Sequence, residues 1–154
     1  MITSRYITPE DLPLLSDSLS KDGYHADTPA NFFTEDGTVC LVYQDEAGPI
    51  CFVRGMPLES NGVAIIQLDI QYLDNKDFRR NLKAMLVGFP ELERRAKENG
   101  FSGFFVVSNV PLLRNFCIKR LGFQEYGDEF LVKSLIDNRQ TNSLEVDKQH
   151  EDVV

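Results

Sequence analysis

The sequence lacks the residue types that several common kinds of site require. Histidine occurs only twice, at His25 and His150, so a histidine-based triad or a histidine-rich metal site has little material. The three cysteines, Cys40, Cys51 and Cys117, show no CxxC or Cys/His metal spacing. We therefore expect no metal, and reduced thiols that pack as small hydrophobic side chains. One alternative is a disulfide between Cys40 and Cys51, which could face each other across a hairpin.

Long apolar runs are also missing. No window approaches the roughly eighteen consecutive apolar residues that mark a transmembrane helix. The N-terminal sequence MITSRYITPEDL has neither the basic start nor the apolar core of a signal peptide. Both features predict a cytoplasmic protein that does not enter a membrane.

Positive charge is scarce relative to negative charge. The chain has 16 lysines and arginines against 24 aspartates and glutamates, which gives a formal net charge of −8 at pH 7. This excess opposes nonspecific attraction to nucleic acid phosphates or anionic lipids, so neither is expected as a partner. The segment 137–154 is polar and acidic and has no helical stripe of apolar residues, which predicts a disordered tail or a docking peptide.

The remaining residues, 1–136, suit one globular domain. A hydrophobic content of 42% over 154 residues is enough for a single core. The domain starts with a short strand at Ile2–Ile7 and a helix that Thr8 and Asp11 open in a capping-box pattern. A second short helix is expected after Pro29.

The hydrophobic period then alternates between strand and helix. Three β-rich runs are expected to form antiparallel strands in series. From Asn75 to Gly100, apolar residues recur with the period of a long amphipathic helix, which Gly88 and Pro90 are expected to kink or divide. After the first strand, the predicted strands are Val39–Gln44, Pro49–Leu58, Val63–Leu73, Phe101–Ser108, Phe123–Tyr126 and Glu129–Ile136. A further helix is expected between Phe101–Ser108 and Phe123–Tyr126. The predicted order of elements is βααβββαβαββ.

The stretch from Val107 to Phe123, VSNVPLLRNFCIKRLGF, combines a strand end, a capped helix and a glycine stop. Its NVPLL and KRLGF patterns, joined to this element order, resemble the GNAT (GCN5-related N-acetyltransferase) superfamily over residues 1–136. The resemblance implies an α/β (α+β) acyl-CoA N-acyltransferase fold with a mixed, mostly antiparallel central sheet and flanking helices. In such a fold the parallel strands 63–73 and 101–108 splay apart at their C-terminal ends and open a slot.

The resemblance also implies where a cofactor would bind. The pantetheine arm of acetyl-CoA would pair with backbone groups near Leu68 to Tyr72, and the helix that begins at Asn109 would line the other wall. Basic residues near the start of the long helix would supply charge for the diphosphate. The predicted cofactor-binding residues are Leu68, Ile70, Gln71, Tyr72, Arg79, Arg80, Lys83 and Asn109.

The phosphate loop departs from the superfamily pattern Q/R-x-x-G-x-G/A. Here the chain reads DNKDFRRNLKAML. If Ala84, Met85 and Leu86 align with the first apolar helical turn of the superfamily, Arg80 and Leu82 stand at the two glycine positions. Bulky side chains would crowd a diphosphate, because its oxygens must approach backbone N–H groups closely. Lys76, Arg79, Arg80 and Lys83 could still attract phosphate. The alternative is that these basic residues form an ordinary solvated helix face.

Acyl transfer to an amine needs a group that accepts a proton and a group that donates one to the leaving thiolate. Asp69 and Glu59 are the carboxylates nearest the expected slot, and the alternative for both is a solvated strand position. The last helix lacks the tyrosine that many members carry, so Tyr126 and Tyr72 are substitutes. Cys117 is better explained as a buried thiol. We take Asp69 and Tyr126 as the catalytic candidates.

Two functions from different classes remain open. The first is transfer of an acetyl group from acetyl-CoA to a small amine or a protein lysine. The acidic domain would attract such a cationic acceptor. His25, with Tyr24 and Asp27, could touch this acceptor or form an ordinary loop. The second is an inactive GNAT-shaped binding or structural protein, such as a phage virion-associated or regulatory protein, on a loose resemblance over Asp77 to Phe123. A protein partner and a homodimer are possible for either function.

Overall fold

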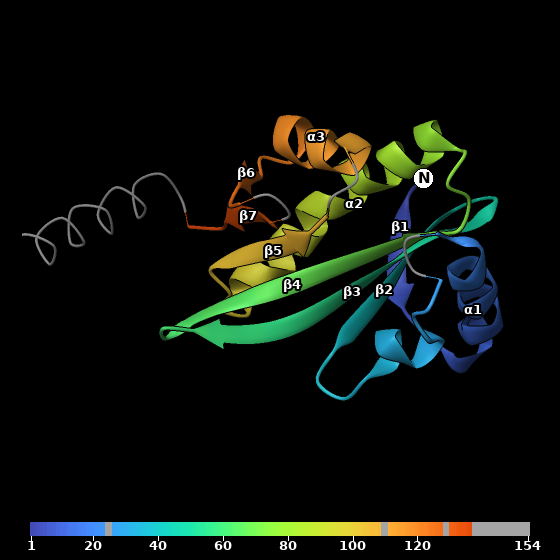
Figure 1. The fold of residues 1–154 in the computed structure, drawn as a ribbon, viewed down its shortest axis with the longest axis horizontal. Helices are drawn as coiled ribbons and strands as arrows, with labels where there is room; N and C mark the ends of the chain where they lie inside the picture. Colours follow the sequence, from blue (N-terminus) through green and yellow to red (C-terminus); the bar gives the residue numbers. More distant parts are fainter. Residues whose placement is uncertain (24–25, 109–110, 128–129, 137–154) are drawn as a thin grey trace, which may run out of the picture.

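The computed structural model describes residues 1–23, 26–108, 111–127 and 130–136. They form a seven-stranded sheet in the order β1-β2-β3-β4-β5-β7-β6 (Figure 1). The β4–β5 pair is parallel, and the other pairs in the described part are antiparallel. The strands are β1 (Thr3–Tyr6), β2 (Val39–Asp45), β3 (Gly48–Ser60), β4 (Val63–Tyr72), β5 (Gly103–Val107), β6 (Gln124–Glu125) and β7 (Phe130–Ser134).

In the part of the chain that the structure describes, five helical segments accompany the sheet. They are the 3-10 helices η1 (Pro9–Asp11) and η2 (Ala30–Thr34) and the α-helices α1 (Leu12–Lys21), α2 (Phe78–Glu98) and α3 (Pro111–Arg120). The predicted element order and fold class are confirmed, with the second predicted helix present as the short η2. Of the two predicted effects of Gly88 and Pro90, a kink or a division, the division is wrong, because α2 continues through Pro90, which lies on its exposed side. No helix within the described ranges is long and apolar enough to cross a membrane.

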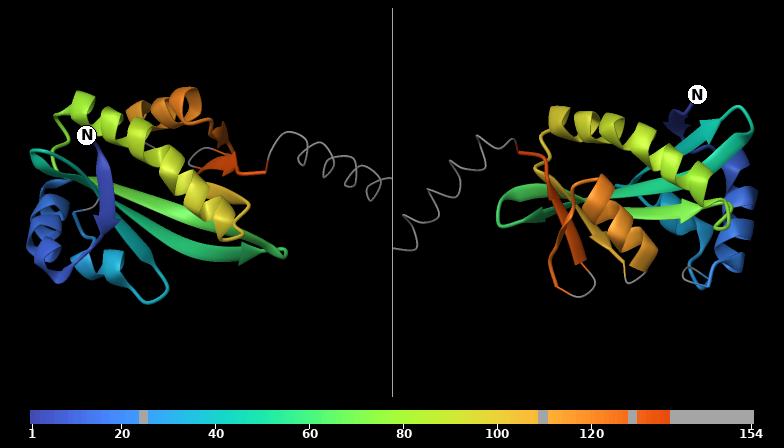
Figure 2. Two further views of the ribbon diagram at one scale, coloured as in Figure 1. Left: turned by 180° about the vertical axis from the view of Figure 1, so that it is seen from behind. Right: turned by 90° about the horizontal axis from the view of Figure 1, so that it is seen from above.

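Two separate cores lie on the two faces of the sheet, because side chains alternate along each strand. Cys51 and Val53 of β3 belong to the core beneath α2 and α3, whereas Phe52 between them belongs to the core beneath α1 and η2. Figures 1 and 2 show the two pairs of helical segments on opposite sides of the sheet. Each core therefore depends on different helices.

Helix α2 lies close against the sheet at Gly88. A Cβ atom at this position would stand only 3.0 Å from the Cζ atom of Tyr43 on β2. The Tyr43 hydroxyl donates a hydrogen bond to the Gly88 carbonyl oxygen at 3.4 Å. Gly88 is therefore needed for a close approach between helix and sheet, whereas the sequence suggested that it weakens the helix.

The cysteines are divided between the two cores. Cys40 lies in the core beneath α1 and η2, whereas Cys51 and Cys117 lie in the core beneath α2 and α3. All three are free and buried, which confirms the expectation of reduced thiols. The alternative prediction of a disulfide between Cys40 and Cys51 is wrong, because their side chains occupy opposite faces of the sheet. Burial raises the pKa of Cys40 and of Cys117 to about 12.

Candidate functional site

The parallel strands β4 and β5 pair over only part of their length. Their register runs from Ile65 opposite Gly103 to Leu68 opposite Val106. Beyond this point β4 follows β3 as far as Tyr72, which lies opposite Cys51. Strand β5 instead remains paired with β7, its neighbour on the other side, as far as Val107. The two strands therefore part at their C-terminal ends, as the predicted fold requires.

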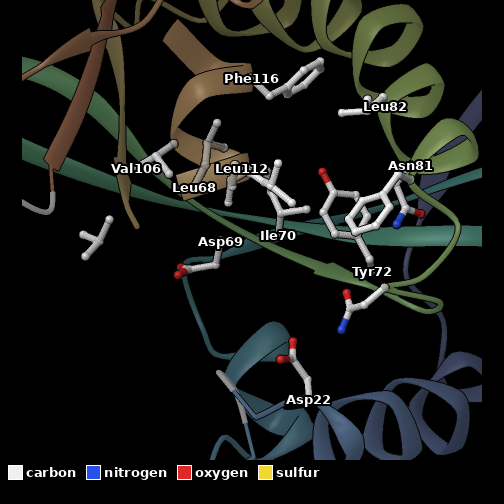
Figure 3. Close-up of a pocket in the computed structure, with 14 residues that line it drawn as sticks. Asp22, Leu68, Asp69, Ile70, Tyr72, Asn81, Leu82, Val106, Leu112 and Phe116 are labelled. Atoms are coloured by element: carbon white, nitrogen blue, oxygen red, sulfur yellow. The ribbon is translucent and has the colours of Figure 1, made fainter. Parts of the chain in front are cut away.

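A cavity of about 360 Å³ opens where the strands part (Figure 3). Its walls come from β4, β5, the first turns of α2, and α3, with one residue after the end of α1. Most of its lining side chains are apolar, and its volume lies within the range of small-molecule sites. The lining residues are Asp22, Leu68, Asp69, Ile70, Tyr72, Asn75, Phe78, Asn81, Leu82, Val106, Val107, Leu112, Leu113 and Phe116.

The residues predicted on β4 fall on two sides of this cavity. Leu68, Ile70 and Tyr72 point toward α2 and α3, whereas Asp69 lies on the side of α1 and η2, as Figure 3 shows. Gln71 is fully buried, and its side-chain amide donates to the Ser18 hydroxyl at 2.9 Å. Gln71 therefore ties β4 to α1 through its side chain.

Tyr72 presents a phenol to the cavity. Burial raises its pKa well above the ordinary tyrosine value, with smaller contributions from Cys51 and Cys117. The phenol therefore stays protonated at neutral pH and can donate a hydrogen bond to a ligand.

Asp69 belongs to an ion-pair network centred on the buried Arg54 of β3. Arg54 Nη1 lies 3.1 Å from Asp69 Oδ2, and Nη2 lies 3.3 Å from Glu35 Oε2. Arg54 Nε donates to the Phe32 carbonyl oxygen at 2.8 Å, and the guanidinium lies over the Phe32 ring. This network fixes the Asp69 side chain beside the cavity.

Other candidates lie elsewhere. Tyr126 is 71% exposed and follows β6, the edge strand, so the structure does not bring it to the cavity. Glu59 is exposed near the β3–β4 turn, and Cys117 is buried in the core rather than lining the cavity. Asn109, Tyr24, His25 and the tail 137–154 lie outside the described residues, while Asp27 is exposed. Within the described residues, no group of three or more histidine, cysteine or acidic side chains could hold a metal ion.

Several backbone donors of the loop before α2 and of its first turn bond to residues of the same segment. The Asp77 side chain caps α2 by accepting from Arg80 N at 3.2 Å. Asp74 Oδ1 accepts from Lys76 N at 2.9 Å, and the Asp74 carbonyl oxygen accepts from Asp77 N. The Asp77 carbonyl oxygen accepts from Asn81 N at 3.0 Å. Side chains of the chain itself thus occupy the start of this helix.

The predicted phosphate-binding side chains are not gathered at one point. Arg80 turns toward the β2–β3 turn, where its Nη2 lies 2.7 Å from Asp45 Oδ1 and 3.0 Å from the Gly48 carbonyl oxygen. This pairing lowers the pKa of Asp45 below its usual range. Arg79 and Lys83 are exposed on the helix and do not line the cavity.

The prediction missed several residues of the cavity. Phe78 and Leu82 begin the apolar stripe of α2, but they are 56% and 39% exposed and line the cavity. Leu112 of α3 is 65% exposed on the opposite wall. In the sequence, the apolar stripe of α2 begins with Phe78 and Leu82, ahead of the residues that pack against the sheet. This early start of the stripe is the signal that could have identified these two residues.

Comparison with known proteins identifies the fold. A scan against protein-family models and a search of curated proteins give no match. Among solved structures, the chain is similar to the GNAT family N-acetyltransferase YhbS from Escherichia coli in complex with CoA, with 20% identity, a TM-score of 0.63, and coverage of 89% of this chain and 83% of that one. The architecture of this chain is therefore the GNAT fold.

Two aminoglycoside acetyltransferases give the same result. Aminoglycoside 6'-acetyltransferase type Ii is 14% identical with a TM-score of 0.69, over 90% of this chain and 99% of that one. AAC(6')-Ib, solved with acetyl-CoA and an aminoglycoside, is 11% identical with a TM-score of 0.67, over 92% and 96%. These likenesses show the fold. The looser resemblance to phage virion proteins has no support from them.

Proposed function

We propose that the protein is an N-acyltransferase that moves an acyl group from a thioester, with acetyl-CoA as the formal donor, to an amine. The observation that carries this proposal is the parting of β4 and β5 around an apolar cavity. Solved structures of the same fold hold CoA or acetyl-CoA, which supports a thioester donor. The backbone of β4 from Leu68 to Tyr72 would align the donor's pantetheine arm.

The alternation of side chains on β4 suggests how two substrates would meet. The donor arm would lie against Leu68 and Ile70 on the apolar side. A cationic amine would approach from the opposite side, where Asp22 and Asp69 line the cavity (Figure 3). The gap between the strands would join the two sides. A small-molecule amine is supported as the acceptor by the aminoglycoside bound in a structure of this fold.

The chemistry would use groups that the cavity provides. The amine nitrogen forms a bond to the thioester carbonyl carbon, the carbon–sulfur bond breaks, and the nitrogen loses a proton while the sulfur gains one. We assign proton removal to Asp69, directly or through water. We assign the hydrogen-bond donor for sulfur to Tyr72 in place of Tyr126, because Tyr72 lines the cavity and keeps its proton.

Release of thiol from acetyl-CoA in the presence of a panel of small amines tests this function. Asp69→Asn should lower kcat at least tenfold, and Asp22→Asn should mainly raise KM for the amine. Glu59→Gln is the matched control, because this carboxylate is exposed and does not line the cavity. An unchanged kcat in a folded Asp69→Asn protein would remove Asp69 from the reaction.

A second candidate is a GNAT-shaped binding protein without catalysis. The self-capped loop before α2 favours it, because this is the point where a phosphate group would need free backbone donors. It predicts no thiol release by the unaltered protein with any amine of the panel. The cytoplasmic location, a protein partner and a homodimer stay predictions from the sequence.

A further inference from the structure

The start of α2 does not fit the diphosphate of a nucleotide cofactor. An anion site at a helix start relies on backbone N–H groups that point outward. Here the Asp77 carboxylate holds Arg80 N, and the Asp74 carboxylate holds Lys76 N. A diphosphate bound at these two donors would have to displace the carboxylates and would then lie beside two negative charges.

Arg80, the basic residue bonded at the start of α2, is directed away from a diphosphate at this point. Arg80 forms two bonds to Asp45, at 2.7 and 2.9 Å, and a third to the Gly48 carbonyl oxygen. These contacts direct its guanidinium toward the β2–β3 turn. Phe78, the first residue of α2, lines the cavity with an aromatic side chain that is 56% exposed.

The cavity itself fits an uncharged and largely apolar arm. Leu68 and Ile70 of β4 face Leu82 of α2, and Leu112 and Phe116 of α3 form the remaining wall. Covering the exposed parts of Leu82 and Leu112 with a ligand would remove apolar surface from water, at about 25 cal/mol per Å². The Tyr72 phenol and the Asn75 and Asn81 amides add polar groups at the end nearest α2.

We propose that this cavity recognises its donor through the acyl-pantetheine arm, and that the nucleotide diphosphate contributes little to binding. The donor class is therefore an acyl thioester of pantetheine, whether or not a nucleotide is attached. This inference rests on the proposed function and narrows its substrate class. It predicts that affinity for a donor depends on the pantetheine arm and the acyl group, and little on an attached nucleotide.

Isothermal calorimetry on the full chain with acetyl-CoA and with S-acetylpantetheine tests the inference. The two dissociation constants should lie within tenfold of each other, and adenosine 3',5'-bisphosphate should not compete at millimolar concentration. Acetyl-CoA binding more than tenfold tighter would overturn the inference and leave the acyltransferase proposal standing. Absence of binding by both thioesters would overturn both proposals.

Asp77→Asn sharpens the test, because asparagine also caps helices well but carries no charge. Affinity for acetyl-CoA should rise about three- to tenfold, whereas affinity for S-acetylpantetheine should stay within twofold. Asp36→Asn is the control, because it removes one exposed negative charge away from the cavity. An unchanged acetyl-CoA affinity in Asp77→Asn would show that Asp77 does not exclude the diphosphate and would overturn its assigned role.

Discussion

The first turns of α2 and its middle turns share one apolar stripe but have different surroundings. Phe78 and Leu82 are partly exposed and line the cavity, whereas Met85 and Phe89 are almost fully buried against the sheet. The difference arises because the helix begins beside the gap between β4 and β5 and then crosses paired strands. The same hydrophobic pattern thus serves a ligand site at one end of the helix and the core further along.

The largest expected effect comes from the buried part of the stripe. Phe89→Ala should destabilise the protein by about 3–5 kcal/mol, because it removes a ring packed against Phe104 and Phe123. Urea denaturation measures this change. Val87→Ala, on the exposed side of the same helix, should cost less than about 1 kcal/mol. Equal losses in both variants would contradict the distinction between buried and exposed turns.

A smaller effect is expected where α2 approaches the sheet most closely. Gly88→Ala should destabilise by about 1–3 kcal/mol, because the added methyl group would crowd the Tyr43 ring. Helix propensity alone predicts the opposite sign, since alanine favours helices by up to about 1 kcal/mol over glycine. Thermal unfolding of the variant decides between them, and a raised Tm would show that the helix shifts freely.

The first turns should affect binding more than stability. Leu82→Glu places a charge in the cavity wall and should weaken S-acetylpantetheine binding at least tenfold, with a change in stability below about 1 kcal/mol. Val87→Glu is the matched control, because Val87 is also exposed on α2 but does not line the cavity. Calorimetry on both variants compares them, and equal affinities would place the ligand elsewhere.

The smallest effect concerns the ion pair between Arg80 and Asp45, which joins the first turns of α2 to the β2–β3 turn. Asp45 has a lowered pKa because Arg80 binds its charged form, so the pair stabilises the fold above the ordinary aspartate pKa of about 3.9. This contribution is lost as the pH falls through the folded-state pKa. Asp45→Asn should therefore lower Tm slightly at pH 7, and the difference from the unaltered protein should shrink below pH 4. A difference that persists at acid pH would exclude this ion pair as its cause.

Local patterns in the sequence were sufficient for the fold. β-rich runs separated by turn residues predicted β2, β3 and β4, and the helical period and capping residues predicted the helices between and around the strands. The resemblance to the GNAT superfamily, and not the local pattern, places a slot near Leu68 to Tyr72, and the cavity is lined by Leu68, Ile70 and Tyr72. The strands and helices could be predicted because each depends mainly on neighbours in the chain, whereas the cavity depends on how the distant strands β4 and β5 pair.

Features that depend on distant contacts could not be predicted. The pairing of Asp69 with Arg54 depends on the register of β3 and β4, which places the two residues opposite each other. The partnership of Arg80 with Asp45 depends on how α2 lies over the β2–β3 turn. Tyr126 was chosen for its chemistry, but its position depends on the path of the chain after α3.

The division of the buried thiols between the two cores provides a pair of internal probes. A thiol reacts with an alkylating reagent as its thiolate, so Cys40, Cys51 and Cys117 should be protected until the surrounding structure opens. Modification of Cys40 would report opening beneath α1 and η2, and modification of Cys117 would report opening beneath α2 and α3. Mass spectrometry after a short alkylation pulse would thus show whether a ligand rigidifies one face of the sheet or both.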